Sequence, residues 1–187
     1  MDLHRPPSTP AGPRPPRLGI DIGRVIIDGP AHPGGGDTAF FTGDDAALLA
    51  TPEVPGAIAS MARLVTAFAG QVWLVSKCGP RVQARTLRWL DGHDLYRRTG
   101  IPPDHVRFCR ARADKRGHCE ELGLTHFVDD RVEVHAAIRG VVDHSYLFGP
   151  QSGPVPPSVR HLVAWEDVER AVLATLAAGK ASAPPRR

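Results

Sequence analysis

Four polar features of this 187-residue chain have side chains that suit metal and phosphate chemistry, and each is expected where a strand ends or the next helix begins. They are Asp21, Ser76, Lys115 and the adjacent pair Asp129-Asp130. Three carboxylates need a cation if they are to lie close together, and hard oxygen ligands suit Mg²⁺. An ammonium and a hydroxyl add hydrogen-bond donors for a phosphate. The residue types therefore indicate a single site that binds a magnesium ion and a phosphate group.

The first of these acids, Asp21, lies within the apolar stretch 18–27, which predicts a buried strand. A continuous apolar run is typical of a parallel sheet that helices cover on both faces. A buried carboxylate costs free energy unless a cation or hydrogen bonds compensate its charge. Gly23 follows two residues later, where the backbone can approach a ligand closely. Asp21 is thus the residue around which we expect a site to form.

Strands and helices alternate along the chain, which predicts an α/β protein with a doubly wound, Rossmann-like parallel sheet of about five strands. The other strands are expected at 71–77, 105–109, 125–130 and 141–148. Helices are expected at 55–69, from Gly79-Pro80 onward, at 114–122, at 132–139 and around 165–176. The carboxyl ends of parallel strands meet at one edge of the sheet, so the four polar features should converge there.

The length suits one domain with tails. We expect a Pro-rich disordered tail over 1–17, the α/β domain over 18–178 and a second disordered tail over 179–187. The Gly- and Pro-rich connection at about 29–55 predicts a short irregular lid, and a mobile surface loop is the alternative. A further Pro/Gly loop is expected over 149–160.

Composition and charge argue against several classes of function. The net charge is +3, with much of the basic excess in the tails, which argues against nucleic acid as a partner. No apolar run approaches the ~20 residues of a membrane span, and the N-terminus has no apolar signal region. The three cysteines form no CxxC motif. These features predict a cytoplasmic protein with reduced thiols and no membrane partner.

The ordered set of motifs resembles the haloacid dehalogenase-like superfamily, specifically its phosphatases of minimal-cap type, over roughly residues 18–148. The motifs are Ile20-Asp21-Ile22-Gly23-Arg24-Val25, Leu74-Val75-Ser76, Asp114-Lys115-Arg116 and Phe127-Val128-Asp129-Asp130-Arg131. Each motif alone is weak evidence, because Asp129-Asp130 could cap a helix and Ser76 could end a strand in a turn. Their order along the expected sheet makes the set more specific.

The resemblance implies a Mg²⁺-dependent phosphohydrolase that acts on a phosphate monoester through an aspartyl-phosphate intermediate. Asp21 would attack phosphorus, and Lys115 would bind phosphoryl oxygens and hold Asp21 beside the other acids. The residues implied to bind the substrate phosphate are Ser76, Lys77, Lys115, Gly23 and Arg24. The residues implied to hold Mg²⁺ are Asp21, the carbonyl of Gly23, Asp129 and Asp130, with Asp130 favoured as a direct ligand.

One departure from the family pattern concerns Gly23. Most phosphatases of the family have a second Asp at this position, where it protonates the leaving group. General acid catalysis contributes about 10²–10⁴-fold, so its loss would slow the enzyme without abolishing activity. Some sugar-phosphate phosphatases of the family also have glycine there. Arg24, a water or a substrate with a good leaving group are the alternatives that could compensate.

The connection after the first strand is too short for the helical cap domain of the family, which implies an open site. An open site favours a large substrate, or a homodimer whose second subunit supplies the lid. The phosphorylated substrate is not identified, and a nucleotide, a sugar phosphate and a larger molecule are all left open. A second hypothesis is a catalytically weak or inactive protein that binds phospholigands in a regulatory role. Dehalogenase chemistry is disfavoured, because Ser76-Lys77 and the acidic pair suit phosphate and metal.

Overall fold

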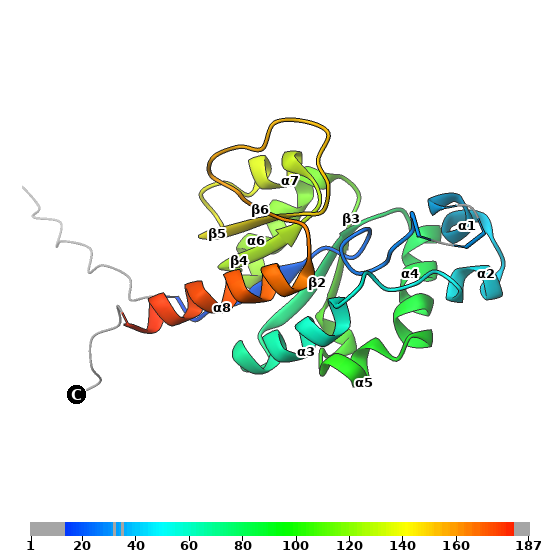
Figure 1. The fold of residues 1–187 in the computed structure, drawn as a ribbon, viewed down its shortest axis with the longest axis horizontal. Coiled ribbons are helices and arrows are strands. Elements are labelled where there is room, and N and C mark those ends of the chain that lie inside the picture. Colours follow the sequence, from blue (N-terminus) through cyan, green and yellow to red (C-terminus); the bar gives the residue numbers. More distant parts are fainter. Residues whose placement is uncertain (1–13, 32, 35, 182–187) are drawn as a thin grey trace, which may run out of the picture.

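The computed structural model describes residues 14–31, 33–34 and 36–181. Its centre is a parallel sheet of six strands in the order β3-β2-β1-β4-β5-β6 (Figure 1). The strands are β1 (Leu18–Ile20), β2 (Val72–Lys77), β3 (Val106–Cys109), β4 (His126–Asp129), β5 (His144–Phe148) and β6 (Arg160–Leu162). The predicted α/β class and doubly wound sheet are confirmed, with six strands where about five were expected.

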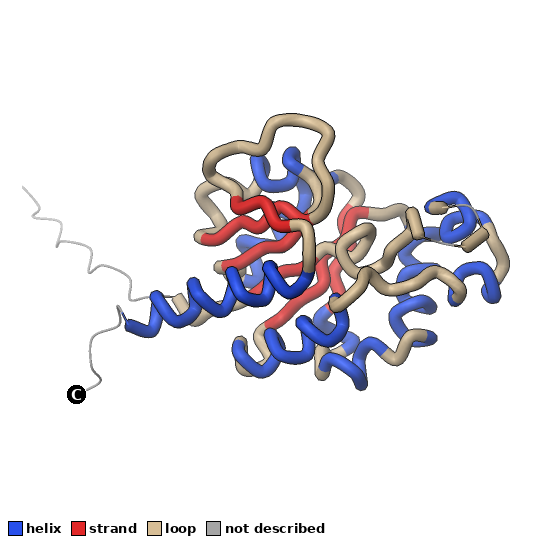
Figure 2. The backbone as a smooth tube through the Cα atoms, in the orientation of Figure 1, coloured by secondary structure: helices blue, strands red, loops and turns tan. Residues whose placement is uncertain are grey.

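Helices cover both faces of this sheet (Figures 1 and 2). They are α1 (Asp37–Thr42), α2 (Asp45–Leu49), α3 (Ala57–Ala67), α4 (Pro80–Gly92), α5 (Leu95–Thr99), α6 (Lys115–Leu122), α7 (Val132–Ala137) and α8 (Trp165–Ala181), with short 3₁₀ turns η1 (Pro103–His105) and η2 (Arg112–Asp114). Among the described residues, no helix is both long enough and apolar enough to cross a membrane.

Alternate residues of the central strands build two apolar cores, because successive side chains of a strand point to opposite faces. Ile20, Leu74 and Val128 pack with α3 and α8 in the larger core. Val75 and Phe127 point the other way and pack with α6 and α7. The sheet therefore holds its carboxyl edge between two buried layers, which gives side chains at that edge a fixed position.

The first strand is shorter than predicted, ending at Ile20 where the sequence suggested residue 27. Beyond it the chain turns: the amides of Ile26 and Ile27 both donate to the Ile22 carbonyl, at 2.9 and 3.0 Å. Ile22, Ile26 and Ile27 remain buried in this turn. The apolar run therefore predicted correctly that these residues are buried, but burial alone does not distinguish a strand from a tightly packed turn.

Residues 29–55, expected to be irregular, contain α1 and α2. Both helices lie beside α4 at one end of the molecule (Figure 1). Side chains of α4 hold α1 and the chain just after α2, since Arg85 Nε donates to the Phe40 carbonyl at 2.7 Å and Trp89 Nε1 donates to the Thr51 carbonyl at 2.9 Å. This segment is therefore attached to the domain by contacts that are distant in sequence.

Two other expectations differ from the structure near the C-terminal half. β5 begins at His144, three residues after the expected start, and β6 follows where the predicted loop 149–160 ends. β6 has three residues at the sheet edge, mostly exposed, so it carries no apolar alternation that would reveal it. The tails predicted for 1–17 and 179–187 lie largely outside the described residues, although the chain is described from residue 14 and α8 continues to Ala181.

Trp165, the first residue of α8, ties this helix to the turn after β1. Its indole Nε1 donates a 2.7 Å hydrogen bond to the Val25 carbonyl, and both residues are fully buried. Trp165→Phe keeps most of the apolar contact but leaves that carbonyl without its donor. We expect the free energy of unfolding to fall by about 1–3 kcal/mol, measured by urea denaturation. Trp73→Phe is the control and should cost less, because no hydrogen bond of the Trp73 indole is found among the described residues.

Candidate active site

Asp21 lies at the carboxyl end of β1, in the middle of the sheet. Its amide donates to the Val128 carbonyl of β4 at 2.9 Å, which continues the β1–β4 pairing by one residue. Its side chain is 10% exposed. The backbone therefore fixes Asp21 at the strand edge while its carboxylate stays reachable from one side.

Lys115 is the residue that brings the acids of β1 and β4 together. It is the first residue of α6 and is 2% exposed. Its Nζ donates to Asp21 Oδ1 at 2.7 Å and to Asp129 Oδ2 at 2.6 Å. Burial opposes the ammonium charge, but Asp21 and Asp129 outweigh it and raise the pKa of Lys115 above its usual value. The lysine therefore stays charged and bridges two carboxylates that would otherwise repel each other.

Asp129 is completely buried, and both of its carboxylate oxygens are in use. Oδ2 accepts from Lys115, and Oδ1 accepts from the Arg131 amide at 2.9 Å. The adjacent Asp130 is partly exposed at the cavity. The alternative that the acidic pair caps α7 is wrong, because the N-cap of α7 is Arg131 and it makes no side-chain capping bond.

Asp21, Asp129 and Asp130 form a group that fits a metal ion. One carboxylate oxygen from each lies within 4.8 Å of the others. Burial, and then the charge of Asp21, raise the pKa of Asp129 above its usual value and that of Asp130 to about 6. Lys115 pairs with Asp21 and Asp129, and Arg131 pairs with Asp130 at 3.2 Å, so two positive charges face three carboxylates. A divalent cation with oxygen ligands would compensate the remaining negative charge. The donor set and its charge therefore suit Mg²⁺.

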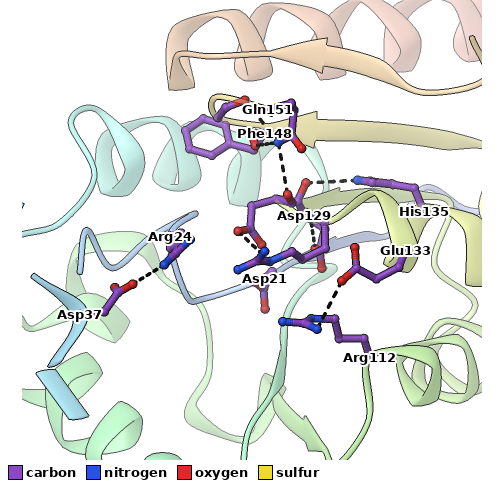
Figure 3. Close-up of polar contacts among 12 residues, drawn as sticks. Asp21, Arg24, Asp37, Arg112, Asp129, Glu133, His135, Phe148 and Gln151 are labelled. Atoms are coloured by element: carbon purple, nitrogen blue, oxygen red, sulfur yellow. Dashed lines mark hydrogen bonds and ion pairs between the residues drawn. The ribbon is translucent and has the colours of Figure 1, made fainter. Parts of the chain in front are cut away.

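Side chains of His135 and Gln151 hold the backbone of the acidic pair (Figure 3). His135 Nε2 donates to the Asp129 carbonyl at 3.1 Å, and Gln151 Nε2 donates to the Asp130 carbonyl at 3.2 Å. Burial lowers the pKa of His135 to about 4, so its imidazole is neutral at pH 7. These two bonds fix the backbone of the acidic pair and so the direction of both carboxylates.

A cavity of about 360 Å³ opens over this edge of the sheet. Its walls include seven of the residues singled out in the sequence: Asp21, Gly23, Arg24, Ser76, Lys77, Lys115 and Asp130. Asp129 is the exception, since it lies behind the cavity wall against Lys115. Within the described part of the chain, the Ser76 hydroxyl has no hydrogen-bond partner and the Lys77 ammonium has no ion-pair partner. Both groups can therefore bind an anion.

Other wall residues were given no role in the site by the sequence. They are chiefly Asp37, Phe40 and Phe41 of α1, Arg112 of η2, and Arg131. Arg131 is the last residue of the fourth motif but was given no role in the site, whereas α1 reaches the cavity only through the way residues 29–55 fold. In Figure 3, Arg24 with Asp37 lies on one side of Asp21 and Arg112 with Glu133 on the other. The cavity thus has charged residues on both flanks of the central acid.

Lys115 can be tested as the residue that compensates the buried acids. Lys115→Met would leave Asp21 and Asp129 buried side by side without their cation, and we expect the free energy of unfolding to fall by about 3–5 kcal/mol. Lys77→Met is the matched control, because Lys77 is an exposed lysine at the same cavity without an ion pair among the described residues. Urea denaturation without added divalent cation measures both. Equal stability of the two variants would contradict this role for Lys115.

No protein-family model matches the sequence, and no curated protein sequence matches it. Solved structures do match its fold. One is a haloacid dehalogenase-like family hydrolase from Xanthomonas campestris, with 12% identity and a TM-score of 0.57 over 89% of this chain and 98% of that chain. Another is a HAD family hydrolase from Deinococcus radiodurans R1 with bound phosphate and sodium, with 16% identity and a TM-score of 0.59 over 87% of this chain and 97% of that chain.

The share of the two solved structures that this chain covers indicates whether they carry a cap domain that it lacks. Because these two chains are matched over nearly their whole length, neither carries a large domain that this chain lacks. The strand order and the site at the carboxyl edge agree with the resemblance seen in the motifs. The protein therefore has the haloacid dehalogenase-like fold.

Proposed function

We propose that the protein is a Mg²⁺-dependent phosphohydrolase that acts through an aspartyl-phosphate on Asp21. The observation that carries this proposal is the bridge from Lys115 to Asp21 and Asp129, with an oxygen of Asp130 less than 5 Å away. The fold neighbours named as hydrolases support hydrolysis, and the one with bound phosphate supports the choice of ligand.

Two steps would make up the reaction. The Asp21 carboxylate forms a bond to phosphorus while the bond from phosphorus to the leaving oxygen breaks, and the leaving group takes that electron pair. Water then attacks the phosphorus of the aspartyl-phosphate, which releases inorganic phosphate and restores Asp21. Lys115 holds one Asp21 oxygen throughout, so the carboxylate keeps its orientation between the two steps.

Two further side chains of the cavity would bind the phosphoryl group without forming a covalent bond to it. The Ser76 hydroxyl and the Lys77 ammonium would donate to the phosphoryl oxygens. Mg²⁺, held by Asp21, Asp130 and the Gly23 carbonyl with Asp129 beside them, would draw charge from those oxygens. The negative charge developing on the phosphoryl group would then meet cations that are already in position.

A substrate panel tests this proposal. Purified protein is incubated with acyl, aryl, sugar and nucleotide phosphates, with and without Mg²⁺, and phosphate release is measured. We expect release from at least one substrate, dependent on Mg²⁺. No release across the panel, together with a raised melting temperature in inorganic phosphate, would favour the alternative of a phospholigand-binding protein. The observation that favours this alternative is Gly23, which stands where most phosphatases of the family have a proton donor.

A further inference from the structure

The structure has open space where a proton donor could project. A Cβ built on Gly23 would meet no atom within 4 Å, and Gly23 lines the cavity. Apart from Asp21 and Asp130 of the reacting edge, the cavity wall described here includes one more carboxylate, Asp37 of α1. Asp37 accepts a hydrogen bond from Nη2 of Arg24. Because the arginine keeps its proton, Asp37 is an ionised acceptor and has no proton to donate to a leaving group.

Arg24 follows Gly23 in an unusual backbone conformation. Its φ is 62°, in the left-handed region, which costs a non-glycine residue about 1–2 kcal/mol. Such strain persists only where surrounding contacts hold it, and it is common at functional sites. Here the Arg24 amide donates to the Ile27 carbonyl at 2.9 Å, and the guanidinium pairs with Asp37. These backbone and side-chain contacts hold Arg24 in the cavity wall. Arg24 follows Asp21 by three residues, and it lies with Asp37 to one side of Asp21 (Figure 3).

A guanidinium and a carboxylic acid treat a leaving group differently. Arginine stays protonated at any ordinary pH, so it can donate hydrogen bonds and positive charge but cannot transfer a proton. A leaving alcohol needs a proton, because an alkoxide is a very strong base. A leaving carboxylate or phosphate needs none, because it is stable as an anion at neutral pH. The group beside the leaving oxygen therefore selects the class of substrate.

We infer that Arg24, positioned by Asp37, is the specificity-determining residue of the cavity and that it selects phosphoryl compounds whose leaving group departs as a stable anion. This inference rests on the proposed phosphohydrolase activity. The substrate class comprises acyl phosphates and phosphoanhydrides, and it excludes phosphates of simple alcohols. In the step concerned, the bond from phosphorus to the leaving oxygen breaks, its electron pair stays on that oxygen, and the anion pairs with the Arg24 guanidinium without any proton transfer.

The experiment is a leaving-group series with Mg²⁺: acetyl phosphate, pyrophosphate, 4-nitrophenyl phosphate, phenyl phosphate and glycerol phosphate. The measured quantity is kcat/KM, which reports the first phosphoryl transfer. We expect it to fall steeply with the pKa of the leaving group, by about 10²-fold or more from acetyl phosphate to glycerol phosphate, the scale of missing acid catalysis. Acetyl phosphate and pyrophosphate distinguish an acyl from an anhydride substrate. Asp21→Asn gives the background hydrolysis of each compound.

Variants of the pair identify the residue responsible. Arg24→Asn removes the charge but suits the left-handed backbone, which asparagine adopts readily. We expect it to lose about tenfold or more in kcat/KM for acetyl phosphate and pyrophosphate, the scale of one charge-assisted hydrogen bond, and less for glycerol phosphate, so that the dependence on leaving-group pKa becomes shallower. Arg24→Lys should recover part of the loss. Asp37→Asn should show a smaller change of the same kind, because Asp37 only positions the guanidinium.

The outcomes separate this inference from the function on which it rests. A flat dependence on leaving-group pKa, or an equal loss for all substrates in Arg24→Asn, would overturn the role of Arg24 and leave the phosphohydrolase standing. Absence of turnover for every compound, acetyl phosphate included, would overturn both. A steep dependence that becomes shallower in Arg24→Asn supports both.

Discussion

The Asp21→Asn variant is expected to release phosphate no faster than the uncatalysed background. An amide has the shape of the carboxylate but cannot form the bond to phosphorus, and enzymes provide at least about 10⁶-fold over the uncatalysed reaction. The fold should persist, because Lys115 keeps its bond to Asp129 and one of three clustered negative charges is removed. Phosphate release with Mg²⁺ and far-ultraviolet circular dichroism measure the two effects.

The control for this variant is Asp91→Asn. Asp91 is an exposed residue near the end of α4 and does not line the cavity. It should retain full activity. If Asp21→Asn kept a measurable fraction of the wild-type rate, Asp21 would not be the nucleophile, and the chemistry would have to begin from water or another side chain.

Gly23→Asp is expected to raise activity toward phosphates of simple alcohols. The new side chain would enter open space in the cavity, and the φ of Gly23 is outside the left-handed region, so the substitution strains neither packing nor backbone. A carboxylic acid there could protonate a leaving alcohol. We expect kcat/KM for glycerol phosphate to rise by about 10²–10⁴-fold, the range of general acid catalysis, with little change for acetyl phosphate.

Gly23→Asn is the matched control, since it has the same shape and no acidic proton. A gain confined to Gly23→Asp assigns the effect to proton donation. An equal gain in both variants would mean that the side chain acts by contact with substrate. No gain in either would mean that the departure of the alcohol is not limited by the missing acid, which would contradict the account of Gly23.

The site was largely predictable because its residues follow from topology. Asp21, Ser76 and Lys115 are far apart in the sequence, yet each stands at a strand end or at the start of the following helix, and parallel strands bring those positions to one edge. Apolar runs located the strands well enough to place them. The expected magnesium ligands likewise come from the ends of β1 and β4, which are neighbours in the sheet.

What the sequence did not reveal depends on contacts between distant segments. The turn at residues 22–27 is as apolar as a strand, so its conformation is set by hydrogen bonds and by Trp165 rather than by local pattern. The helices α1 and α2 lie against α4, and that distant contact helps to place Asp37 beside Arg24. No local signal marks Asp37 as a residue of the cavity, because its role follows from the fold of a segment rich in glycine and proline.

The claim on which everything else rests is that Asp21 carries the phosphoryl group. Enzyme mixed with acetyl phosphate and Mg²⁺ can be quenched in acid within its first turnovers, reduced with borohydride, digested and analysed by mass spectrometry. Reduction converts an aspartyl-phosphate into an alcohol, so the account predicts this change at Asp21 only, and only when both substrate and Mg²⁺ are present. An unmodified Asp21 in a sample that is turning over, with the phosphoryl group on another residue, would contradict it.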